Sequence, residues 1–148
     1  MLIQTLKTLF RRDLEKLKQE ISLYADENKL WVTERDIANS AGNLCLHLVG
    51  NLNTYIGAEI GKTGYIRHRD LEFSLKNIPR QELIKKVEDT IIVVENAFDT
   101  LKDEQLGEEY PLLVFAEKTS IGYFLVHLSM HLGYHLGQIN YHRRLLDK

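Results

Sequence analysis

The sequence predicts an all-α protein, a four-helix bundle with a long crossover between its second and third helices. Four stretches of about 22–28 residues repeat apolar side chains at spacings of three and four, the period of an amphipathic helix. No stretch carries the pattern of a strand. A link of about fifteen residues, long for a bundle loop, separates the second and third helical stretches.

Length and composition limit the class of protein. With 148 residues, the chain is expected to form a single domain over 1–148. The net charge is −2 and no long basic run occurs, so nucleic-acid binding has little support. No run approaches the ~20 apolar residues of a membrane span, and the N-terminus meets charge too early for a signal peptide. With one cysteine, no intramolecular disulfide forms. We therefore expect a cytoplasmic protein that binds neither nucleic acid nor membranes.

The first helix is predicted over residues 2–24 and faces the core without chemistry of its own. Its apolar positions are Leu2, Leu6, Leu9, Phe10, Leu14, Leu17 and Ile21. Charged residues occupy mostly the opposite side. The polar segment 26–29 then ends this helix, and residues 30–32 are expected to pack over one end of the bundle.

The second helix is predicted over about residues 39–60. Asn39 and Ser40 are both suitable N-caps, although Thr33 with Asp36 offers an earlier start. Cys45 is expected to be a buried small apolar residue, because it lies about 200° around the helix from His47.

A polar row of Asn43, His47 and Asn51 repeats every fourth residue of this helix. The two amides would orient a histidine ligand at a buried cavity, or they would bond to loops and a partner helix. The pattern alone does not choose between these two interpretations.

The connection that follows carries the charged residues Arg67, Arg69, Asp70 and Glu72. A solvated segment held by ion pairs is favoured here over substrate contact. If a carboxylate of this connection reaches a metal bound by the histidines, Glu72 is the first candidate.

The third helix is predicted from Pro79 to about Lys102, since proline suits a first helical turn. Its core positions are Leu83, Val87, Ile91, Val94, Phe98 and Leu101. The stretch 103–118 contains Gly107 and Pro111 and is not expected to form one regular helix. The fourth helix is predicted from Thr119 and Ser120 to about Leu146.

Three histidines, His127, His131 and His135, recur every fourth residue of the fourth helix. Positions four apart differ by only ~40° around a helix, so His131 and His135 share a face one turn apart. Burying imidazoles without partners is unfavourable, and a divalent metal would satisfy them. A catalytic zinc takes three protein ligands, and His47 is the best third supplier.

The other histidines and polar residues receive different interpretations. His127 lies ~80° from His135 and is expected at the edge of the ligand face, behind the ligands or in the cavity wall. His68 reads as loop or surface, and His142 is flanked by arginines near the C-terminus. The residues close enough in sequence to line a pocket, or to pack, are Tyr134, Gln138 and Tyr141.

These residues resemble a known family. A histidine in the second helix, followed in the fourth by His131-x-x-x-His135-x-Gly137-Gln138, resembles the DinB-like (DinB/YfiT) superfamily. The resemblance covers nearly the whole chain, and segment 64–73 is similar to an uncharacterised branch. One position differs: Leu136 stands where many members carry arginine. The resemblance implies a metal site at His47, His131 and His135.

The sequence does not determine the identity of the metal or the type of reaction. Imidazole ligands suit zinc, the default, and also nickel, iron, cobalt or copper. The chain lacks the His-Glu-x-x-His motif of zinc proteases, any Glu-x-x-His pair and a credible nucleophile with its base. The resemblance implies a metal-dependent enzyme, either an S-transferase that uses a low-molecular-weight thiol or a hydrolase that uses metal-bound water. The alternative is a non-catalytic metal-binding or interaction module.

Self-association is expected mainly from the resemblance, which implies a homodimer. Leu112, Leu113 and Phe115 fall outside the main apolar stripes and would form an exposed patch.

Overall fold

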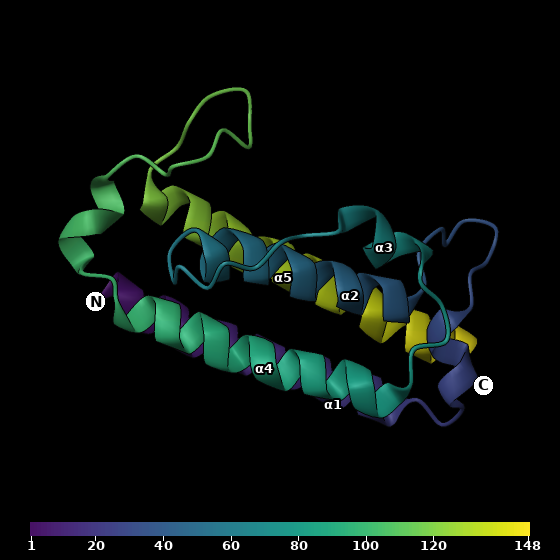
Figure 1. Cartoon of the computed structure of the whole chain (residues 1–148). Coiled ribbons are helices and arrows are strands. Elements are labelled where there is room, and N and C mark those ends of the chain that lie inside the picture. Colours follow the sequence, from purple (N-terminus) through teal and green to yellow (C-terminus); the bar gives the residue numbers. More distant parts are fainter.

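The computed structural model describes all residues 1–148 and is all-α, which confirms the predicted fold class. Four long helices lie side by side (Figure 1): α1 (Leu2–Leu23), α2 (Ala41–Leu52), α4 (Arg80–Asp99) and α5 (Ile121–Leu146). The shorter elements are the 3₁₀ helices η1 (Glu27–Trp31) and η3 (Asp103–Gly107), the π-helix η2 (Asn53–Ala58) and the short helix α3 (Arg69–Ser74).

Each of the four long helices packs against at least two of the others. Helix α1 packs against α4 and α5, whereas α2 packs against α5, α4 and α3. Figure 1 shows that α2 and α4 run in the same direction. The chain after η2 therefore returns along α2 and forms α3 before α4 begins.

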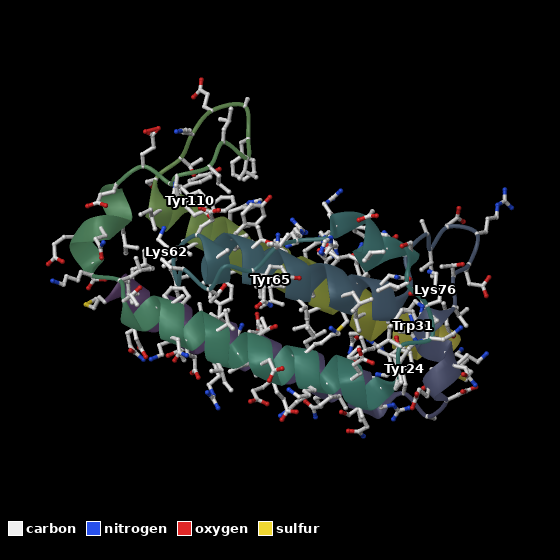
Figure 2. The ribbon with its side chains drawn as sticks, in the orientation of Figure 1. Tyr24, Trp31, Lys62, Tyr65, Lys76 and Tyr110 are labelled. Atoms are coloured by element: carbon white, nitrogen blue, oxygen red, sulfur yellow. The ribbon has the colours of Figure 1, made fainter.

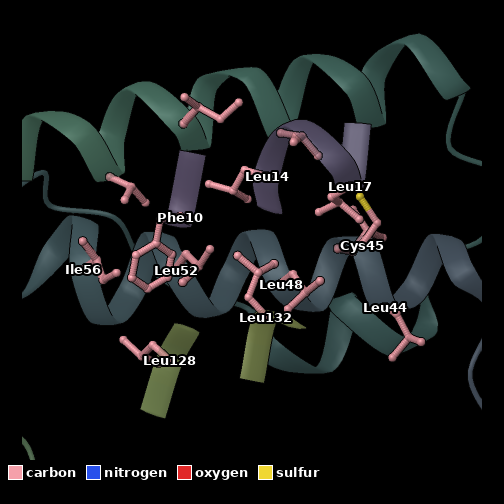
Figure 3. Close-up of a cluster of buried hydrophobic side chains, with 14 of the residues drawn as sticks. Phe10, Leu14, Leu17, Leu44, Cys45, Leu48, Leu52, Ile56, Leu128 and Leu132 are labelled. Atoms are coloured by element: carbon pink, nitrogen blue, oxygen red, sulfur yellow. The ribbon is translucent and has the colours of Figure 1, made fainter. Parts of the chain in front are cut away.

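The interior is built from the apolar stripes of the four long helices. Figure 3 shows Phe10 and Leu14 of α1, Leu48 of α2, and Leu128 and Leu132 of α5 in one cluster of buried side chains. All five are buried, and burying such a side chain stabilises the fold by about 1.5–3 kcal/mol. This packing fixes the rotation of α2 and α5, so their polar rows meet on one side of the core.

Helix α2 begins where Ser40 accepts a hydrogen bond from the Asn43 amide at 3.2 Å. The prediction of one continuous α-helix to residue 60 is wrong beyond Leu52, because the turns widen into η2. The Glu59 amide there reaches the Thr54 carbonyl at 3.2 Å, five residues back. The Asn53 side chain fixes the junction by donating to Val49 O and to Thr90 of α4.

Most of the connection between α2 and α4 is exposed and held by an ion pair, as the sequence favoured, but Glu72 of that pair is buried against α2. Asn43 of α2 donates to the main-chain carbonyls of Glu72 at 3.0 Å and Leu75 at 2.8 Å, and so ties α3 onto α2. The Glu72 side chain is buried beneath this contact. Periodicity does not reveal such a contact, because it depends on side chains that bridge segments about thirty residues apart.

Both ends of the bundle are closed by aromatic side chains. Trp31 and Tyr24 lie at one end and Tyr110 at the other (Figure 2). Leu30 is buried and Trp31 packs on the core, which confirms the expected position of this segment. His142 is also structural, because it hydrogen-bonds Tyr24 Oη at 2.7 Å and donates to Val32 O at 2.8 Å.

The last two long helices follow the predicted pattern with shorter bounds. Pro79 occupies the N-cap position of α4 rather than its first turn, and α4 ends at Asp99 instead of Lys102. Ser120 caps α5 by accepting from the Tyr123 amide at 3.1 Å. None of the helices combines the length and apolar character needed to cross a membrane.

Candidate metal centre

Helices α2 and α5 bring three histidine side chains together. Nε2 of His131 lies 3.3 Å from Nε2 of His47 and 3.1 Å from Nε2 of His135. One ligand atom from each residue lies within 4.8 Å of the other two. Two imidazole nitrogens bound at 2.0–2.1 Å to a tetrahedral zinc would be about 3.3 Å apart. The observed spacing fits such an ion.

The outer ring nitrogens of two of these histidines are held by hydrogen bonds. Nδ1–H of His47 donates to Glu72 Oε1 at 3.0 Å, and Nδ1–H of His135 donates to Gln138 Oε1 at 2.7 Å. Each bond places the proton on Nδ1, so each Nε2 presents a lone pair to His131. Nδ1 of His131 is buried without a partner. A proton on His131 Nε2 can be donated fully to only one of the two facing lone pairs, whereas a cation bound by the three Nε2 atoms would engage both.

His131 and His135 are in the neutral form that a metal ion requires. Burial, followed by the neighbouring imidazoles of His135 and His47, lowers the pKa of His131 to about 4. Burial also lowers the pKa of His135 below its ordinary value, despite the hydrogen bond that its ring donates to Gln138. Both rings are therefore neutral at pH 7, and metal binding does not have to displace a proton from either.

A buried ion pair supports His47 from behind. Arg67 donates from Nε to Glu72 Oε2 at 2.8 Å and from Nη2 to Oε1 at 3.0 Å. Burial would raise the pKa of Glu72, but the hydrogen bonds from His47 and Arg67 outweigh it and keep this pKa below its ordinary value. A carboxylate on the distal nitrogen of a metal-binding histidine raises the basicity of the ring and fixes its orientation.

Gly50 makes room for this carboxylate. A Cβ atom at residue 50 would lie only 1.9 Å from Glu72 Oε2. The absence of a side chain one turn beyond His47 is therefore what allows α3 to bring Glu72 against α2.

The cluster adjoins a cavity of about 170 Å³. Its wall consists of His47, Asn51, Tyr55, Arg67, Arg69, Val114, Phe124, His127, Leu128 and His131. Three larger hollows, of about 430, 540 and 350 Å³, lie elsewhere on the chain and contain none of the three clustered histidines. The smaller cavity is therefore the candidate site for a ligand.

A family model described as "Protein of unknown function (DUF1572)" matches residues 2–148. The chain belongs to this family. No curated protein matches the sequence. The three-histidine cluster is thus a feature of a DUF1572 chain.

The remaining predicted site residues of this DUF1572 protein occupy three kinds of position. His127 lines the cavity, with its ring 6.4 Å from that of His131 and 4.7 Å from that of Phe115. Asn51 lines it as well, whereas Gln138 lies behind His135. The residues that lie outside the cavity wall are Asn43, which holds α3, and the mostly exposed Tyr134 and Tyr141.

Arg67 is a residue of this site that the sequence did not single out. The only local signal was an arginine five residues before Glu72 in a connecting segment, which is more often a solvated ion pair. The chain returns along α2 after η2, and this return places the Arg67–Glu72 ion pair against His47.

Proposed function

We propose that this DUF1572 protein is a metal-dependent enzyme of the DinB-like superfamily. His47, His131 and His135 would be the protein ligands of a divalent ion, with zinc as the default. The observation that carries the proposal is the convergence of the three Nε2 atoms beside a cavity. A purely structural zinc site is closed by four protein ligands, whereas three ligands next to a cavity leave a position for a substrate.

The bound ion would act as a Lewis acid towards a carbonyl, water or thiol. The chain's own groups have separate tasks. Glu72 and Gln138 fix the ligand rings, so that the ligand geometry is set before a substrate enters. His127 is the nearest imidazole outside the ligand set and lies in the cavity wall, where it can accept or return a proton.

The favoured reaction is transfer of a small thiol, with hydrolysis as the rival reaction. Cys45 cannot supply the thiol, because it is fully buried and burial raises its pKa to about 12. The nucleophile would therefore be an external low-molecular-weight thiol. The non-catalytic metal-binding module remains the competing function, and a fourth protein ligand on the ion would favour it.

Cobalt-substituted protein distinguishes these possibilities. If small thiols bind in the open position, titrating 2-mercaptoethanol should add intense near-ultraviolet absorption, and the His131→Ala variant should show none. If no thiol changes the spectrum while a simple ester is turned over, hydrolysis replaces transfer. If neither occurs and the ion is fully coordinated by the chain, the protein is a binding module.

We further propose that the protein forms a homodimer through the exposed face of α5. The apolar residues exposed along this face are Tyr123, Val126, Met130, Tyr134, Tyr141 and Leu145. They recur at helical spacings, and the exposed residues Leu112, Leu113 and Phe115 lie in the loop just before α5. Such a continuous apolar surface is typical of an interface.

Sedimentation equilibrium at micromolar concentrations should give the mass of a dimer. Met130→Glu should shift the protein towards the monomer, since it places a charge in the middle of the apolar face. A wild-type protein that remains monomeric over this range would refute the dimer.

A further inference from the structure

The cavity beside the histidines has basic side chains in its wall and no acidic ones. Its wall contains two arginines and three histidines but no carboxylate. A divalent ion bound by the histidines would add two further positive charges. In a partly enclosed site this field is strong, because the surrounding protein screens it less than water does.

The two arginines differ in how many of their N–H donors are free to bind a ligand. Arg67 is committed to Glu72 through two hydrogen bonds, and its guanidinium lies over the Tyr55 ring at 5.7 Å. Arg69 makes no ion pair or hydrogen bond, and its only specific contact is with the Phe73 ring, 5.4 Å from the guanidinium carbon. Stacking on an aromatic ring positions a guanidinium while leaving its N–H donors free.

Asn51 provides an independent sign of a ligand. Its side chain is buried in the cavity wall, with a relative exposure of 6%, and its Oδ1 atom has no hydrogen-bond partner. A buried amide oxygen without a partner costs about 1–3 kcal/mol. Because Oδ1 is an acceptor, a ligand that brings a hydroxyl or another hydrogen-bond donor into the cavity would give it a partner.

We propose that the substrate is a small anion, a carboxylate or a phosphoryl compound, whose charged group is bound by Arg69. A hydroxyl group on the same compound would donate to Asn51 Oδ1. This inference rests on the proposed function, because it names the class of substrate for the same site. The cavity volume of about 170 Å³ limits the bound part to a small group.

Calorimetric titration of the zinc-loaded protein with acetate, inorganic phosphate and neutral acetamide tests this proposal. At least one anion should bind about tenfold more tightly than acetamide, because hydrogen bonds to charged groups are the stronger ones. The tighter of the two anions identifies the carboxylate or the phosphoryl class. Arg69→Gln should remove most of this preference, and Arg69→Lys should restore part of it.

Arg35→Gln is the matched control, because Arg35 is also exposed and lies outside the cavity wall. It should leave anion binding unchanged. Zinc content is measured for every variant, and all should retain the ion, since Arg69 contacts no ligand. Equal binding of anions and acetamide, or anion binding that survives Arg69→Gln, would overturn the proposal while the metal site stands. Loss of zinc from the wild-type protein would instead indicate failure of the proposed function.

Discussion

His131→Ala should remove the metal from the protein. Nε2 of His131 is the atom that contacts both His47 and His135, so its loss leaves two ligands on separate helices. Binding energies of about 10–16 kcal/mol for four-ligand zinc sites correspond to roughly 3–4 kcal/mol per ligand, or about 10²–10³-fold in affinity. Elemental analysis after dialysis against a weak chelator should find stoichiometric metal in the wild type and almost none in the variant.

His127→Ala is the control on the same helix. His127 lies in the cavity wall outside the ligand set, so this variant should keep its metal. Stoichiometric metal in the His131 variant, or loss in the His127 variant alone, would show that the ligand set is wrong.

Gly50→Ala should damage both the fold and the metal site although it adds only a methyl group. The new Cβ atom would lie 1.9 Å from Glu72 Oε2, so the carboxylate has to leave its position between His47 and Arg67. The carboxylate is the end of a flexible side chain and can move, so the cost is the loss of its charge-assisted hydrogen bonds, about 1.5–3 kcal/mol. Losing the carboxylate behind a metal ligand lowers metal affinity by about 10–100-fold. Urea unfolding of the metal-free protein and a competitive zinc titration measure the two effects separately.

Gly133→Ala provides the comparison, because a Cβ atom at this position of α5 meets no atom within 4 Å. It should stabilise the protein by about 0.5–1 kcal/mol, as alanine does in a helix interior. If Gly50→Ala proves as harmless as Gly133→Ala, the close packing of Glu72 on α2 is refuted.

Much of the fold and the histidine cluster could be predicted because they depend on local periodicity. The spacing of His131 and His135 fixes their common face as soon as α5 is recognised. His47 could be chosen because it lies in the middle of an apolar helix, and the two helices have only one side on which polar rows can meet. The buried positions of the long helices follow from the same period of three and four.

The surroundings of the histidines could not be predicted in the same way. Arg67 and Glu72 belong to a connection without periodicity, and their burial depends on how the chain returns along α2. The role of Asn43 as an anchor for α3 and the widening of α2 into η2 arise from contacts between distant segments. Side-chain contacts of this kind are decided by tertiary packing, which residue spacing does not encode.

We expect His47, His131 and His135 to hold a divalent ion that keeps one coordination position open for a substrate. The X-ray absorption spectrum at the zinc edge of the zinc-loaded wild-type protein tests it most directly. We expect three imidazole nitrogens and one further light atom at about 2.0–2.1 Å. A shell of sulfur, a fourth imidazole, or a protein that takes up no stoichiometric zinc would contradict this expectation.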